Sequence, residues 1–313
     1  MKKWSIGIII FFLAFIGSVY LLIPNKITIT ADATVKATRQ AVYRMLLNDE
    51  SLSKWWPGTV STDSAKKQFL LNEYSYTISD NNLTLLPITI KKKQIELHTS
   101  LYLIAPQTER VQLHWSGELP TSYNVIQRYI RFRKAKQVKR DMNSILQKMS
   151  AFFSKPENLY GYTIHHLKIV DSTYISTYDT SLTYPSTAYI YNRINKLKDY
   201  AARHSARETG YPILNIDAED SLHYIIRVAL PLDKPLPSAS DIYPKRMPVN
   251  VNILMMEVRG GTETNSAAFE QLLHYVSDHH QTIPGIPFYS LVTNRSGEPD
   301  TSKWITRIYC PVR

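Results

Sequence analysis

The second half of the chain repeats one pattern twice, and this repeat restricts the possible folds more than any other feature. In each copy a strand-like segment precedes an amphipathic segment, and a Gly-x-Pro turn then opens a pair of strands that ends at a proline. We therefore expect two similar strand–helix–strand–strand halves over about 161–232 and 248–313. The predicted segments are 166–178, 186–204 and 210–231 in the first copy, and 249–259, 265–280 and 285–311 in the second.

The last strand of each copy alternates in a way that assigns its two faces. Successive side chains of a strand point to opposite sides of the sheet, so every second residue shares a face. One face carries a row without charges in both copies, and we expect this row to pack under the helices. The row consists of Tyr224, Ile226, Val228 and Leu230 in the first copy, and of Trp304, Thr306, Ile308 and Cys310 in the second.

The opposite face places Arg227 and Arg307 at corresponding points of the two copies. Two guanidinium groups facing one cleft predict an anion clamp, because arginine binds carboxylate or phosphate with two parallel hydrogen bonds. In the alternative interpretation both arginines are solvated, or they pair with Glu257 or Asp217. The predicted ligand-binding residues are Arg227, Arg307, Tyr309, Glu257 and Tyr289.

The end of the chain carries a family resemblance. Residues 298–312 read EPDTSKWITRIYCPV, which resembles the closing signature of the DNA-gyrase-inhibitor-like effector-binding domain, and the match covers about 161–313. The resemblance implies a small molecule bound in the cleft between two pseudo-symmetric halves. The family's usual acidic residue in the last strand falls at Arg307 here, so the expected ligand preference shifts toward anions.

Residues 26–156 follow a different order. A strand over 26–37 precedes a short helix capped by Thr38, then strands over 68–79, 83–92, 94–104 and 110–118, and a long amphipathic helix over 134–153. This order is typical of an α+β fold. With the close at Ser53-Lys54-Trp55-Trp56-Pro57 it resembles the START/polyketide-cyclase (SRPBCC) superfamily, which implies a helix-grip fold around an apolar cavity.

The amino terminus contains an uncharged run of 20 residues from Trp4 to Ile23. A helix of this length spans about 30 Å, the hydrocarbon thickness of a bilayer. The run is longer than the core of a signal peptide and lacks a small-residue cleavage site, which favours an uncleaved anchor over 1–25. Lys2 and Lys3 favour a single-pass protein with its amino terminus in the cytoplasm and its folded domains outside.

Composition narrows the function further. One cysteine excludes an intramolecular disulfide framework, and the formal net charge of +11 favours anionic partners. No metal site, cofactor motif or catalytic constellation is apparent, and we expect no nucleic-acid partner. The sequence predicts a membrane-anchored, non-enzymatic protein that binds an anionic or amphipathic small molecule in the C-terminal cleft, with the START-like cavity as a second place. The alternative is a hydrolase or cyclase acting on a small apolar substrate.

Overall fold

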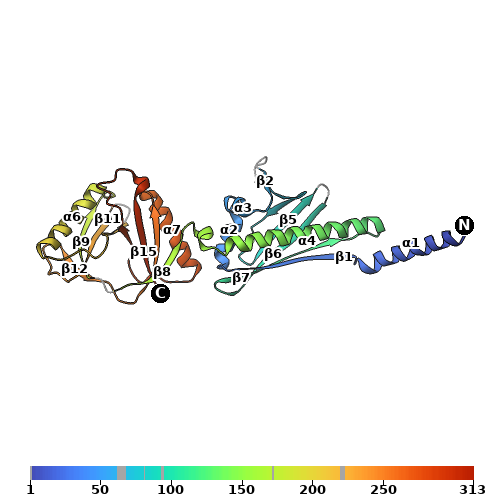
Figure 1. Ribbon diagram of the computed structural model, residues 1–313, viewed down its shortest axis with the longest axis horizontal. Helices are drawn as coiled ribbons and strands as arrows, with labels where there is room; N and C mark the ends of the chain where they lie inside the picture. Colours follow the sequence, from blue (N-terminus) through green and yellow to red (C-terminus); the bar gives the residue numbers. More distant parts are fainter. Residues whose placement is uncertain (1, 62–67, 81, 93–94, 171–172, 219–222) are drawn as a thin grey trace. The chain divides into compact units, whose positions relative to one another are not determined.

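The computed structural model describes residues 2–61, 68–80, 82–92, 95–170, 173–218 and 223–313. The chain divides into two compact units, Met1–Lys155 and Pro156–Arg313. Each unit combines helices with one antiparallel sheet (Figure 1). The fold is therefore mixed α+β, as the order of predicted segments indicated.

The N-terminal unit is a seven-stranded antiparallel sheet with the strand order β1-β7-β6-β5-β4-β3-β2. The long helix α4 packs against β1 and β7, and the short helices α2 and α3 fill the connection between β1 and β2 (Figure 1). The strands are β1 (Lys26–Val35), β2 (Thr59–Ser61), β3 (Gln68–Leu71), β4 (Tyr74–Ile78), β5 (Leu85–Lys92), β6 (Ile95–Gln107) and β7 (Arg110–Pro120), and the helices are α2 (Arg39–Leu47), α3 (Asp49–Trp55) and α4 (Val125–Phe153).

Side-chain caps set where these helices begin. The hydroxyl of Thr38 accepts a hydrogen bond from the backbone N–H of Ala41, as the sequence predicted for the start of α2. The side chain of Asn124 accepts from the N–H groups of Ile126 and Gln127, so α4 begins at Val125 rather than at residue 134. The sequence prediction missed these nine residues because they lack a continuous apolar stripe.

Aromatic side chains fill the space between the sheet and α4. Trp55 lies edge-on to Phe153 of α4 with 5.4 Å between ring centres, and Trp56 lies 5.4 Å from Tyr76 of the sheet. The indole N–H of Trp115 donates to the Thr99 hydroxyl at 2.8 Å, which satisfies its only polar atom in the core. The tryptophan pair predicted to end the first helical segment is therefore part of the core.

The structure overturns the predicted membrane anchor between Trp4 and Ile23. This segment forms α1 (Lys2–Leu22), yet none of the helices formed by the described residues has the length and hydropathy that crossing a bilayer requires. The end of the segment packs against the N-terminal unit instead. Ile23 is buried and its carbonyl accepts hydrogen bonds from the buried Arg128, whose guanidinium lies 5.0 Å from the centre of the Tyr20 ring.

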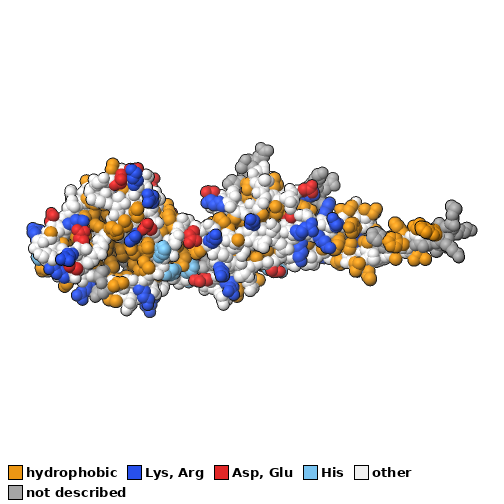
Figure 2. Space-filling view, viewed as in Figure 1, with side chains coloured by type: hydrophobic (Ala, Val, Ile, Leu, Met, Phe, Trp, Pro, Cys, Tyr) orange, Lys and Arg blue, Asp and Glu red, His pale blue; other side chains and the backbone are white. Residues whose placement is uncertain are grey.

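The predictions that depended on this anchor are corrected with it. A transmembrane helix is not part of the fold class, and a membrane is not supported as a partner. The single-pass localisation with a cytoplasmic amino terminus is wrong for the same reason. Apolar side chains such as Phe11 and Leu21 are nevertheless exposed along α1 (Figure 2).

The C-terminal unit is an eight-stranded antiparallel sheet with the strand order β12-β9-β11-β10-β14-β15-β13-β8. Strands β9, β10 and β11 on one side of the centre correspond to β13, β14 and β15 on the other. The strands are β8 (Ile164–Lys168), β9 (Thr173–Ser181), β10 (Ile213–Ala218), β11 (Tyr224–Leu232), β12 (Tyr243–Arg246), β13 (Asn252–Arg259), β14 (Phe288–Leu291) and β15 (Ile305–Val312), and the helices are α5 (Pro156–Tyr160), α6 (Thr187–Arg203), α7 (Thr262–Asp278) and the 3-10 turn η1 (Thr301–Lys303).

The single strand predicted over 166–178 is two strands. β8 pairs with β13, whereas β9 pairs with β11 on the other half of the sheet. The two segments are therefore separate strands with different partners. Strand periodicity alone did not reveal this division because both segments alternate in the same way.

The two Gly-x-Pro turns have equivalent contacts. A Cβ on Gly210 would lie 3.5 Å from the ring of Pro231, and a Cβ on Gly285 would lie 3.3 Å from the ring of Pro311. Each glycine thus faces the proline at the end of its own copy. The glycine that opens each strand pair and the proline that ends it are therefore in contact with each other in both copies.

The predicted apolar rows lie under the helices. Ile226, Val228 and Leu230 pack in a buried cluster with side chains of α6, and Ile308 is fully buried on the same sheet face. Burial also raises the pKa of the Cys310 thiol to about 11, which fits a core thiol. The sequence prediction of the two faces is confirmed for these rows.

Gly117 of β7 offers a test of packing in the N-terminal unit. A Cβ there would lie 2.4 Å from the Cγ2 methyl of Thr99 on β6, so Gly117→Ala should destabilise this unit by about 1–3 kcal/mol. Urea unfolding followed by tryptophan fluorescence measures the change, since four of the five tryptophans lie in this unit.

Thr99→Ser provides the matched rescue. Serine removes the Cγ2 methyl but keeps the hydroxyl that accepts from Trp115 and donates to the Ile88 carbonyl. We expect the double variant Thr99→Ser/Gly117→Ala to regain most of the stability lost by Gly117→Ala. Equal destabilisation with either residue at position 99 would show that another contact causes the loss.

Candidate functional site

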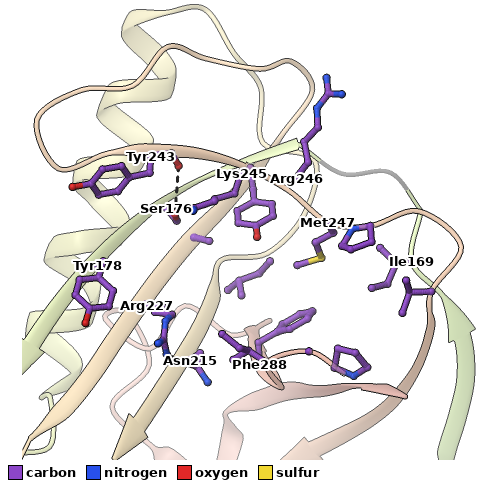
Figure 3. Close-up of a pocket in the computed structure, with 18 of the residues that line it drawn as sticks. Ile169, Ser176, Tyr178, Asn215, Arg227, Tyr243, Lys245, Arg246, Met247 and Phe288 are labelled. Atoms are coloured by element: carbon purple, nitrogen blue, oxygen red, sulfur yellow. Dashed lines mark hydrogen bonds between the residues drawn. The ribbon is translucent and has the colours of Figure 1, made fainter. Parts of the chain in front are cut away.

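The face of the C-terminal sheet opposite the buried rows contains a cavity of about 720 Å³. Its floor comes from β9, β10 and β11, and its sides come from β12 with the segment that follows it and from residues 284–288 (Figure 3). Apolar side chains gather in a hollow of this unit in Figure 2. The volume is within the range of pockets that enclose drug-sized molecules.

Aromatic and aliphatic side chains form most of the lining. The tyrosines at positions 174, 178 and 243 come from neighbouring strands, and Phe288 closes the opposite side. Burial raises the pKa of the Tyr174 phenol, so this hydroxyl stays protonated and can donate a hydrogen bond. The Ser176 hydroxyl donates to the Tyr243 carbonyl at 3.3 Å, which ties β12 to β9 (Figure 3).

Arg227 is the cationic group on the floor of the cavity. Its Nη1 donates to the side-chain oxygen of Asn215 at 2.7 Å, and Asn215 in turn donates to the Pro287 carbonyl at 3.0 Å. The guanidinium also lies 5.8 Å from the centre of the Tyr178 ring. These contacts fix the orientation of Arg227 and occupy few of its five N–H groups, so donors are left for an anion.

The charged side chains in the described lining are all cations. Lys245 and Arg246 add two further cations from β12, and the described residues of the lining include no aspartate or glutamate. Figure 3 shows Lys245 beside Ser176, whereas the guanidinium of Arg246 points away from the cavity. The cavity therefore combines an apolar body with a positive potential at one end.

Arg307, the second arginine of the predicted clamp, does not line this cavity. Its Nε donates to the Glu257 carboxylate at 2.9 Å, as in the alternative interpretation of the sequence, and the hydrogen bond to this carboxylate raises the pKa of Arg307. Strands β10 and β14 separate β15 from β11. Arg307 is thus held by Glu257 outside the cavity that Arg227 lines.

The two predicted tyrosines lie on opposite faces of the sheet. Tyr309 is on the face of the cavity and stacks on Phe288 with 5.0 Å between ring centres. Tyr289 is on the helix face, 6.4 Å from the Phe269 ring of α7, and burial raises its pKa. The structure thus brings Arg227, Arg307, Glu257 and Tyr309 to one face and separates Tyr289 from them.

The sequence analysis missed the residues that β9 and β12 contribute. Alternation on β9 was available as a signal, since Tyr174, Ser176 and Tyr178 share one strand face. The position of β12 was not, because it pairs with β9 from outside the repeat. Lys245 could therefore not be placed at the cavity from spacing alone.

The interior of the N-terminal unit contains a buried carboxylate, Asp141 of α4, which is 2% exposed. It accepts hydrogen bonds from Asn72 at 2.7 Å, from Gln137 at 2.8 Å and from the Tyr76 hydroxyl at 3.4 Å. Burial raises the pKa of Asp141, and these hydrogen bonds only partly oppose the effect. The rings of Tyr76 and Trp115 lie in the same interior, 6.2 Å apart between ring centres.

The comparisons with known proteins find similarity at the level of solved structures. No family model and no curated protein matches the chain. The C-terminal domain of EcmrR is 14% identical, with 49% of this chain and 98% of that one covered and a TM-score of 0.42. A hydrolase from Listeria innocua is 8% identical, covering 49% and 92%, with a TM-score of 0.38.

The N-terminal resemblance also has a counterpart among the solved structures. The Zhui aromatase/cyclase from Streptomyces sp. R1128 is 8% identical, with 40% of this chain and 92% of that one covered and a TM-score of 0.33. At such identities and TM-scores these likenesses say nothing about function. EcmrR has also been solved in a complex with DNA, and that structure is 16% identical with a TM-score of 0.44. The expectation that this chain binds no nucleic acid stays a prediction.

The raised pKa of Asp141 gives a pH-dependent prediction. A carboxyl group whose pKa is higher in the folded state stabilises the fold at low pH, and this contribution is lost as pH rises through the folded pKa. Asp141→Asn removes the ionisation, so we expect it to raise the urea midpoint of the N-terminal unit at neutral pH and to lose this advantage toward pH 3. Tryptophan fluorescence measures both midpoints.

Glu109→Gln, an exposed acid-to-amide change in the turn between β6 and β7, serves as the matched control. It should leave the urea midpoint of the N-terminal unit nearly unchanged at neutral pH. A neutral-pH midpoint for Asp141→Asn below that of the unchanged protein would show that the ionised carboxylate stabilises this core.

Proposed function

We propose that the C-terminal unit binds small amphipathic anions, with an aromatic or aliphatic body in the cavity and an acidic group on Arg227. The observation that carries this proposal is the oriented guanidinium of Arg227 in a largely apolar cavity of about 720 Å³. A cation in such surroundings is less well solvated than in water, so it gains more from an anionic partner.

The shape of the lining supports an aromatic body in particular. Tyr178 lies beside the guanidinium, and Phe288 and Tyr309 present stacked rings on the same sheet face. Aromatic rings stack favourably on one another at such distances. Lys245 and Arg246 supply a second positive region that attracts the anion toward the cavity.

The proposal extends to the fold of both units. We infer that the C-terminal unit is an effector-binding-like domain that prefers anions, because its cavity is lined by Arg227 and Lys245 and by no aspartate or glutamate among the described residues. The N-terminal unit is inferred to be a START-like domain whose interior serves packing around Trp115 and Asp141.

Calorimetric titration of the full chain with 2-naphthoate, 2-naphthylmethanol and 2-naphthylmethylammonium tests the charge preference. The three compounds share one aromatic body and differ in charge. We expect 2-naphthoate to bind most tightly and the ammonium compound least. Tighter binding of the ammonium compound would contradict the proposal.

Two matched arginine variants test the site. Arg227→Gln keeps a donor for Asn215 but removes the charge, and we expect it to weaken 2-naphthoate about 10- to 100-fold, as for loss of one charged hydrogen bond. Arg307→Gln removes a charge from the same face outside the cavity and should change the affinity less than threefold. Equal losses in both variants would instead support the two-arginine clamp.

A further inference from the structure

Arg295, in the connection between β14 and β15, is a largely buried cation whose contacts include no carboxylate within the described part of the chain. Its Nη2 donates to the Thr306 hydroxyl at 2.7 Å, and its guanidinium lies 4.7 Å from the centre of the Trp304 ring. Its Nε is buried without a hydrogen-bond partner. Burial lowers the pKa of Arg295, and an unpaired buried charge of this kind is costly.

Asn265, in the first turns of α7, is a second buried group with unused hydrogen-bonding capacity. It is 5% exposed, its amide nitrogen donates to the Thr306 hydroxyl at 3.3 Å, and its Oδ1 has no partner among the described residues. The Thr306 oxygen then receives two donors. An amide turned by 180° fills the same space, and in that orientation Oδ1 accepts the Thr306 proton while the NH₂ group becomes the unpaired one.

The two groups face the same small cavity, which has a volume of about 20 Å³. Its lining includes the start of α7, where the N-cap is Gly261 and supplies no side-chain hydrogen bond. The N-cap residue therefore supplies no side-chain acceptor at the positive end of the helix dipole. Glu263 of the same turn is exposed and does not line the cavity. The lining residues are Tyr184, Leu214, Thr262, Asn265, Ser266, Tyr289 and Arg295.

The volume of the cavity limits its occupant to one water molecule or one monatomic ion. A water needs roughly 10–15 Å³ of such space, so one water or one halide fits, whereas phosphate, sulfate and carboxylate ligands are too large. A water would satisfy the polar atoms but would leave the charge of Arg295 uncompensated. An anion would compensate the charge of the Arg295 guanidinium and would also be stabilised at the N-terminal end of α7.

We propose that this cavity binds one monatomic anion, of which chloride is the common example, between the Arg295 guanidinium and the first turns of α7. The site is on the helix-covered face, so it is separate from the cavity proposed for amphipathic anions. Tyr289, predicted from the sequence as a ligand-binding residue, lines it. Chloride bound there ties the β14–β15 connection to α7 and stabilises the C-terminal unit.

Calorimetric unfolding of the full chain in sodium chloride, with sodium gluconate added to keep the ionic strength constant, tests the proposal. We expect a saturable rise of about 3 °C in the unfolding temperature with chloride, and no such rise in Arg295→Gln. Arg307→Gln, a matched change outside this cavity, should keep the rise. A rise that is not saturable, or that persists in Arg295→Gln, would overturn the proposal.

If Arg295→Gln does not fold, the variant Asn265→Asp provides a second test of the chloride site. Its carboxylate would supply a permanent anion beside Arg295, so we expect a higher unfolding temperature without chloride and little further rise with chloride. Crystals soaked in sodium bromide should show an anomalous peak beside Arg295. A water there without anomalous signal, or a bromide peak without any chloride-dependent stabilisation in solution, would mean that no physiological halide site exists.

Discussion

The C-terminal unit depends on one constraint, which is that α6 and α7 cover the same face of the sheet. Strand alternation sends one set of side chains under α6 and α7 and the other set to the open face. The buried set includes Ile226 and Ile308, and the open set includes Arg227. Because the open face lacks a helix, β12 and the loops beside it enclose a cavity there instead of a packed core. The candidate site follows from this arrangement.

Arg227 and Arg307 occupy corresponding positions in the two halves but have different partners. Arg307 has a carboxylate partner in Glu257 on the neighbouring strand, so its charge is already compensated. Arg227 contacts the neutral Asn215 on its neighbouring strand, which orients the guanidinium without cancelling its charge. Glu257 lies opposite Arg307 on β13, whereas Tyr178 lies at the corresponding place opposite Arg227 on β9. A carboxylate at one place and a phenol at the other therefore compensate the charge of Arg307 and leave that of Arg227 for an external anion.

Much of the C-terminal fold could be predicted from the repeat, and part of the site could not. The two Gly-x-Pro turns and the uncharged rows at 224–230 and 304–310 predicted the paired halves and their buried face. The division of 166–178 into two strands depends on which distant strands they pair with, and local periodicity does not contain that information. At the amino terminus, hydropathy alone suggested a membrane span. The contacts of Tyr20 and Ile23 with Arg128 are long-range, and they were not visible in the sequence.

The central claim is that an acidic aromatic molecule binds on Arg227. Its most direct test is a crystal structure of the full chain soaked with 4-iodobenzoate, in which anomalous scattering locates the iodine and the electron density shows the carboxylate. The account predicts iodine in the cavity between β9 and Phe288, with the carboxylate hydrogen-bonded to Arg227. Iodobenzoate bound only elsewhere, with no carboxylate density at Arg227, would contradict it.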